Sequence, residues 1–112
     1  MSEKLRLPPA HLRADTREWW TSVLDEFELE EHHIKLLTLA CEAWDRCQQA
    51  RQVLREHGLT YDDRFSQPRN RPEVTVERDS RLAFARLLRE LDLDAEPLGE
   101  SRRPPPLTSN SG

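Results

Sequence analysis

Arginine is the residue type whose number and spacing in this sequence could support a chemical function, namely binding. Seven arginines lie between positions 64 and 89, whereas the same stretch holds only three acidic residues. The planar guanidinium group suits the binding of phosphate groups and base edges. The alternative interpretation is that these are ordinary solvated charges on a loop and a helix. The seven positions are Arg64, Arg69, Arg71, Arg78, Arg81, Arg86 and Arg89.

The other reactive residue types form no catalytic or metal-binding pattern. His32 and His33 are adjacent, and no cysteine or acidic pair near them completes a set of metal ligands. Cys41 and Cys47 are six residues apart in a helical pattern, so they point to different faces and suit a reducing environment as small core residues. Only three glycines occur, and no glycine-rich phosphate loop is present. We therefore expect a binding protein and no enzyme, with no metal and no cofactor.

The first element expected to position such residues is a helix over residues 16–27. Asp15 or Thr16 is a suitable N-terminal cap, and Glu18 completes the pattern of a capping box. A bulky apolar stripe follows at helical spacing. Core packing is the expected use of this stripe, and a partner contact is the alternative. The stripe consists of Trp20, Val23, Leu24 and Phe27, with Trp19 beside it.

A second helix is expected over residues 30–57, ending before Gly58, a residue suited to a left-handed C-terminal position. At 1.5 Å per residue this helix is roughly 40 Å long. Its apolar residues spread over more than one side, so the other two helices of the chain are expected to cover part of it and another subunit could cover the rest. The insert of residues 58–71 contains short β-capable pieces and predicts a β-hairpin-like loop. Pro72 suits the first position of a third helix over residues 72–91.

Length and composition limit the chain to one modest domain with tails. The sequence has 112 residues, of which 36% are hydrophobic and 34% charged. We expect a polar N-terminal arm over residues 1–14, a helical domain over 15–92 and a disordered proline-rich tail over 93–112. The net charge of −4 argues against indiscriminate coating of nucleic acid. No stretch approaches the length of a membrane span, so a soluble, intracellular protein without a membrane role is expected.

The succession of segments resembles the small subunit of phage terminase, a family of tailed phages and prophages. The resemblance covers about residues 8–96, with a weaker echo in "RRPPPL". Many relatives place glycine near Ser66, and many continue the third helix into an "LGLTP"-like segment where this chain has "LDLDAEP". The segments that carry the resemblance are "PPAHLRADTREWW", "LLTLACEAWDRCQQARQVLREHGLTY", "DRFSQPRNRPEV" and "ERDSRLAFARLLRELDLD".

This resemblance implies a mainly α, three-helix protomer with a long central helix, assembled into a homo-oligomeric ring. It implies a non-catalytic component of the viral DNA-packaging motor in the cytoplasm of the infected bacterial host. Its implied partners are other copies of the chain, double-stranded phage DNA and the terminase large subunit. That large subunit carries the ATPase and nuclease, which the ring recruits or regulates.

Three sets of candidate site residues follow. The DNA-binding set is Arg64, Arg69, Arg71, Arg78 and Arg81. The alternative role for this set is intersubunit pairing with the acidic residues of segment 25–31. The oligomer or core interface set is Trp19, Trp20, Ile34, Leu37, Cys41, Trp44, Phe65 and Phe84. The partner-binding tail set is Arg102, Arg103, Pro104 and Pro105.

Two other functions remain open from the residues. A small helical adaptor could bind a protein partner through its tryptophan stripe or its proline-rich tail, without DNA binding. A helix-turn-helix transcription regulator is disfavoured, because the connection between the second and third helices is far longer than the three- or four-residue turn of that motif.

Overall fold

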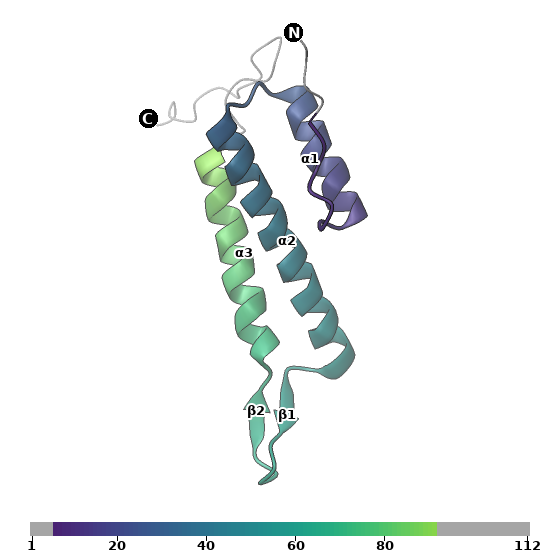
Figure 1. Cartoon of the computed structure of the whole chain (residues 1–112). Helices are drawn as coiled ribbons and strands as arrows, with labels where there is room; N and C mark the ends of the chain where they lie inside the picture. Colours follow the sequence, from purple (N-terminus) through teal and green to yellow (C-terminus); the bar gives the residue numbers. More distant parts are fainter. Residues whose placement is uncertain (1–5, 92–112) are drawn as a thin grey trace, which may run out of the picture.

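The computed structural model of the chain describes residues 6–91, which form three helices and one antiparallel hairpin (Figure 1). The predicted mainly α fold with a hairpin between the second and third helices is confirmed. The predicted tail, including Arg102, Arg103, Pro104 and Pro105, lies outside the described residues. The elements are α1 (Ala14–Glu26), α2 (Glu31–His57), β1 (Thr60–Asp62), β2 (Pro68–Asn70) and α3 (Pro72–Leu91).

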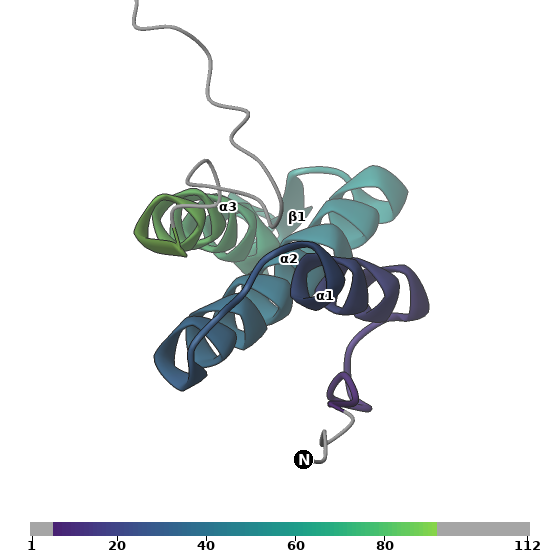
Figure 2. The same ribbon diagram turned by 90° about the horizontal axis from the view of Figure 1, so that it is seen from above.

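Helices α2 and α3 lie side by side and antiparallel, and α1 packs against the first half of α2 (Figures 1 and 2). At the start of α2, the amide of the N-cap residue Glu30 donates to Nδ1 of His33 at 3.2 Å, so this imidazole gives the N-cap amide a hydrogen-bond partner. At the end of α2, Gly58 has a φ of 84°, and its amide donates to the Leu54 carbonyl at 2.8 Å. Gly58 thus ends the helix with a positive φ, as predicted, but its ψ of 176° lies outside the left-handed helical region.

The core lies where the three helices meet. Leu37 and Cys41 of α2 have no exposed surface, and Leu91 at the end of α3 is 3% exposed. The remaining buried members of this cluster are Leu12, Trp20 and Val23. Beyond it, α2 carries a stripe of small buried residues, and Cys47 in this stripe contacts Glu77 of α3. Small side chains on one helix allow its neighbour to approach closely. The stripe is Ala40, Ala43, Cys47 and Ala50.

The start of α1 differs from the sequence prediction. The predicted cap at Asp15 or Thr16 is wrong, because the helix begins at Ala14 and its N-cap residue Arg13 makes no side-chain cap. The carboxylate of Asp45 in α2 takes this role. It accepts the Arg13 amide at 2.8 Å and the Thr16 hydroxyl at 2.6 Å. Helix α1 is thus capped by a residue that lies about thirty positions away in the sequence.

The described part of the N-terminal arm is attached to the helices. The chain turns at residues 10–12 and places Leu12 in the core, where it is 2% exposed. The guanidinium of Arg17 donates to the Leu12 carbonyl, and Nε2 of His11 lies 2.9 Å from a carboxylate oxygen of Glu42. Among residues 6–91, no helix is both long and apolar enough to cross a membrane.

Candidate nucleic-acid and assembly surfaces

The hairpin projects beyond the ends of α2 and α3 (Figure 1). Its two strands pair with Thr60 opposite Asn70 and Tyr61 opposite Arg69, and every residue of both strands is exposed. At its base the Arg71 amide donates to the Leu59 carbonyl at 2.8 Å. Two-stranded hairpins are marginal by themselves in water, so local contacts must hold this one in shape.

Asp63 organises the turn of the hairpin. Its Oδ1 accepts the amides of Phe65 at 2.8 Å and Gln67 at 3.0 Å, and its Oδ2 accepts Nε of Arg69 at 3.0 Å. The amide of Gln67, followed by the guanidinium of Arg69, lowers the pKa of the Asp63 carboxyl below its usual range. Ser66 follows with a φ of 60°, a conformation that glycine adopts more readily.

The other two arginines of the hairpin lie against aromatic rings. The guanidinium carbon of Arg64 is 5.0 Å from the centre of the Phe65 ring, and that of Arg71 is 5.9 Å from the centre of the Tyr61 ring. Phe65 is 68% exposed, so it takes no part in the core of this chain. Arg71 is half-buried, and its enclosed Nε has no hydrogen-bond partner among residues 6–91. Arg64 is therefore at the open tip, whereas Arg71 lies at the base.

Arg78 and Arg81 are both exposed on α3, in the half of that helix that follows the hairpin in the sequence. Arg78 lies 3.5 Å from the carboxylate of Asp79. Arg81 and Arg51 of α2 both bind the Glu77 carboxylate, at 3.2 and 3.0 Å. Hydrogen bonds from Arg81 and then Arg51 lower the pKa of Glu77. Arg51 and Glu77 therefore link α2 to α3.

The five predicted DNA-binding arginines thus occupy the hairpin and the adjoining turns of α3. Three of them, Arg69, Arg78 and Arg81, have a carboxylate within 4 Å. Exposed ion pairs are each worth about 0–1 kcal/mol, so a guanidinium exchanges such a partner for a phosphate at little cost. The five predicted arginines therefore lie toward one end of the molecule, and no strong ion pair within residues 6–91 occupies them.

The acidic segment 25–31 lies at the opposite end of α2 from the hairpin (Figure 1). All five of its carboxylate side chains are exposed. The 27 residues of α2 separate the two ends by about 40 Å at 1.5 Å per residue. The arginine-bearing hairpin of one chain therefore cannot pair with the acidic segment of the same chain. The acidic residues are Asp25, Glu26, Glu28, Glu30 and Glu31.

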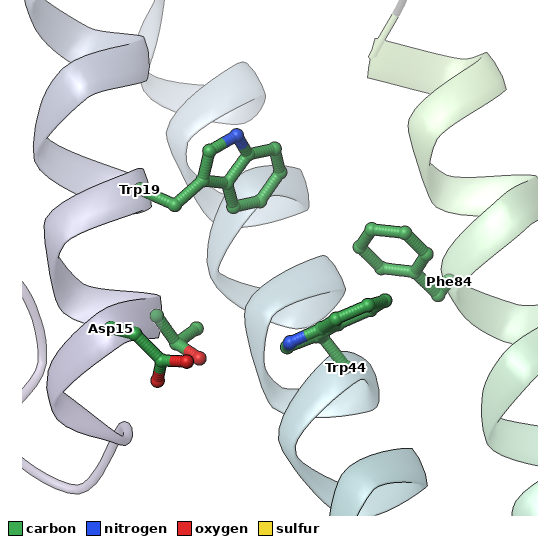
Figure 3. A pocket seen from close by; sticks show the side chains of 5 residues that line it. Asp15, Trp19, Trp44 and Phe84 are labelled. Carbon is green, nitrogen blue, oxygen red and sulfur yellow. The ribbon is translucent and has the colours of Figure 1, made fainter.

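A pocket of about 400 Å³ opens between the three helices and is lined by three aromatic rings (Figure 3). The Phe84 ring of α3 lies with its centre 6.2 Å from that of Trp19 in α1 and 5.1 Å from that of Trp44 in α2. Trp44 is 37% exposed. Asp15 and Thr16 of α1 complete the lining. We call this site the aromatic pocket.

The predicted interface set divides into three groups. Trp20, Leu37 and Cys41 are buried in the core of the single chain, and the indole N–H of Trp20 donates to the Thr38 hydroxyl at 3.1 Å. Burial, with smaller effects of Asp45 and Glu42, raises the pKa of the Cys41 thiol to about 12. The half-buried members are Trp19, Ile34 and Phe84, and the exposed members are Trp44 and Phe65.

Sequence reasoning missed three carboxylates that organise these surfaces: Asp45, Asp63 and Glu77. Asp63 had a local signal, because an aspartate side chain that accepts amides two and four residues later is typical of tight turns. Glu77 had a partial one, because Arg81 follows it four residues later on α3, but its contact with Arg51 of α2 had none. Asp45 had none, since its partners lie before and within α1. Within residues 6–91, no group of three histidine, cysteine or acidic side chains is placed to hold a metal ion.

The described residues thus form a small three-helix protein with a projecting arginine-bearing hairpin and a separate aromatic pocket. Comparison with protein families gives a match to the model described as phage terminase, small subunit, over residues 16–101. This match covers most of the chain, which therefore belongs to the phage terminase small subunit family. The family has a role in phage DNA packaging in the host cytoplasm and is generally non-catalytic. Comparisons with curated proteins and with solved structures give no match.

Proposed function

We propose that this chain is the non-catalytic small subunit of a viral DNA-packaging terminase, acting in the cytoplasm of the infected bacterial host. It assembles with copies of itself into a ring, binds double-stranded phage DNA, and recruits or regulates the ATPase and nuclease of the large subunit. The family match over residues 16–101 carries this proposal. The exposed arginines of the hairpin and α3 supply a chemically suitable DNA contact.

Assembly supports DNA binding by a chain whose net charge is −4. In a closed ring each copy presents the same hairpin, so contacts that are weak for one chain act together. The exposed Leu39 of α2 and Leu82 of α3, at 50% and 55%, are apolar side chains that another copy can cover. Absolute mass from light scattering on a size-exclusion column tests this step. We expect one large closed oligomer at both low and high salt, and a monomer would contradict it.

The DNA contact is tested by removing charges that have the smallest structural role. Among residues 6–91, Arg64 contacts only the Phe65 ring, and Arg78 pairs only with its neighbour Asp79. We expect the double variant Arg64→Ala/Arg78→Ala to bind double-stranded DNA more weakly in fluorescence anisotropy. Its salt dependence should also fall, by about 0.9 in the slope of log K against log salt for each phosphate that the variant no longer neutralises.

A matched control removes the same charge from a different part of the molecule. Lys35 and Arg46 are exposed on α2 and belong to none of the predicted DNA contacts. The variant Lys35→Ala/Arg46→Ala should keep the affinity and slope of the unmodified chain. If the two double variants have equal DNA affinities and equal salt slopes, the hairpin end is not the phosphate-binding surface. A fall in oligomer mass for Arg64→Ala/Arg78→Ala would support intersubunit pairing of these arginines with segment 25–31 instead.

The adaptor function is the second candidate, and the aromatic pocket favours it. Three aromatic rings open to solvent offer a protein-binding site, and three of the five candidate arginines have carboxylate partners in the chain. An adaptor is expected to be a monomer or dimer with no DNA affinity at moderate salt. The mass and anisotropy measurements above therefore separate the two functions.

A further inference from the structure

We propose that the aromatic pocket is a binding site for proline-rich peptide, and that its occupant is the chain's own segment Arg102–Pro106. This site is separate from the DNA contact and the ring proposed above. Aromatic-lined grooves bind polyproline segments because the rings pack against the flat faces of proline, with indole N–H groups available to the exposed peptide carbonyls. In the described part of the chain, Trp20 uses its indole N–H on Thr38, whereas Trp19 and Trp44 make no such bond.

The segment "RRPPP" has the chemistry that this pocket requires. Each proline fixes φ near −65°, so three in succession favour the polyproline II conformation before binding and lose little entropy on binding. Arg102 and Arg103 precede the prolines. The Asp15 carboxylate lies at the edge of the pocket with a side chain 68% exposed, and its one loose ion pair, with Nε of Arg13 at 3.7 Å, leaves its other oxygen available among residues 6–91 (Figure 3). The basic and apolar parts of the segment thus match the acidic and aromatic parts of the site.

The connecting chain has the length that binding within one molecule requires. Residues 92–101 separate the end of α3 from Arg102. A linker of ten residues that behaves as a random coil has a root-mean-square span of roughly 16–19 Å. Phe84 lies seven residues before Leu91 on the same helix, a separation of about 10 Å along its axis. The prolines can therefore reach the aromatic pocket of their own chain without strain.

Attachment also favours the chain's own tail over a free peptide. A short flexible linker gives an effective concentration in the millimolar range. A peptide of sequence SRRPPPL added at about 1 mM should consequently occupy an empty aromatic pocket to a similar extent. The expected equal occupancy by the attached tail and by the free peptide is a quantitative test. It uses no DNA and no large subunit, so its outcome is independent of the proposed function.

The test uses the full chain labelled with 5-fluorotryptophan and observed by ¹⁹F NMR. Trp19 and Trp44 report on the aromatic pocket, and Trp20 in the core is an internal reference. The triple variant with each proline of 104–106 replaced by serine empties the pocket. The matched control replaces Thr108, Ser109 and Asn110 by alanine, beyond the proposed segment.

We expect the signals of Trp19 and Trp44 to move in the proline variant and to stay unchanged in the control. The SRRPPPL peptide at about 1 mM should return them toward their original positions, and SEEPPPL should do so at least several-fold less effectively. Unchanged signals in the proline variant, or no response to the peptide, would overturn the proposal. So would restoration by unlabelled wild-type chain, because the tail would then bind a neighbouring copy.

Discussion

Replacing Asp45 by alanine is expected to release α1 from α2 without unfolding the α2–α3 pair. Asp45 is 9% exposed, and its carboxylate accepts the Arg13 amide at 2.8 Å and the Thr16 hydroxyl at 2.6 Å. Both donors lie at the first turn of α1, where backbone amides have no partner within the helix. Alanine leaves the two donors without a partner and removes a negative charge that favours a helix N-terminus.

The magnitude follows from the two hydrogen bonds. A hydrogen bond to a charged group contributes about 1.5–3 kcal/mol, and water entering at the helix end recovers part of that loss. We therefore expect the variant to lose about 2–4 kcal/mol of the free energy that holds α1 in place. Because 1.4 kcal/mol corresponds to a factor of ten, the population with α1 detached should rise roughly 30- to 700-fold.

The reactivity of Cys41 measures this population, because the thiol lies in the core that α1 helps to cover. In the closed form its pKa is raised from 9.0 to about 12 by burial. At pH 8 the thiolate fraction is then on the order of 10⁻⁴, against about 10⁻¹ at the ordinary pKa, so modification proceeds through opening. We propose to follow thiol labelling by peptide mass spectrometry, with Cys47 under α3 as an internal reference.

The expected result is faster labelling of Cys41 with little change at Cys47. Thr16→Val removes one of the two hydrogen bonds and is the graded control, so its effect should fall between those of wild type and Asp45→Ala. An unchanged Cys41 rate in Asp45→Ala would refute the role assigned to the carboxylate. Equal acceleration at both cysteines would show that the whole fold is destabilised and that α1 does not open separately.

Three further predictions concern the hairpin and the α2–α3 link. Ser66→Gly should relieve the positive φ and stabilise the turn by about 1 kcal/mol, seen as roughly fivefold slower hydrogen exchange of the Gln67 amide. The lowered pKa of Asp63 means that its stabilisation is present above the ordinary pKa of 3.8 and is lost as pH falls through the folded value. The Gln67 amide shift should report this loss below pH 4, and Asp63→Asn should abolish it. Glu77→Gln should lower the free energy of unfolding, measured in urea at pH 7, by up to about 1 kcal/mol. The hydrogen bond from Arg81 lowers the pKa of Glu77, and at a pH below this lowered pKa the variant and the wild type should be equally stable.

The elements were predictable because their signals are local. The apolar residues at helical spacing predicted α2 and α3, and each predicted bound lies within one residue of the observed one. Gly58 marked the end of α2, and Pro72 marked the start of α3. The hairpin followed from short β-capable pieces between those helices. Arg78 and Arg81 of the predicted DNA-binding set are exposed on α3.

The parts that sequence reasoning missed depend on contacts between elements. A local capping rule placed the start of α1 at Asp15 or Thr16, whereas the cap comes from Asp45 in another helix. The same limit applies to the aromatic pocket. Helical spacing identifies an apolar stripe, but it does not show that the side chains of Trp44 and Phe84 leave a cavity between the helices. Such features require the relative placement of three helices.

The separation of charge along α2 limits how the proposed ring can be built. Copies in a closed ring are related by rotation alone, so equivalent points lie at the same height along the ring axis. Pairing between a hairpin arginine such as Arg69 and the acidic segment 25–31 of a neighbour therefore requires both ends of the protomer at one height. Because these ends are about 40 Å apart along α2, this happens only if α2 lies in the plane of the ring. A protomer with α2 along the axis instead gathers every hairpin on one rim, so that the arginines of all copies lie at the same height.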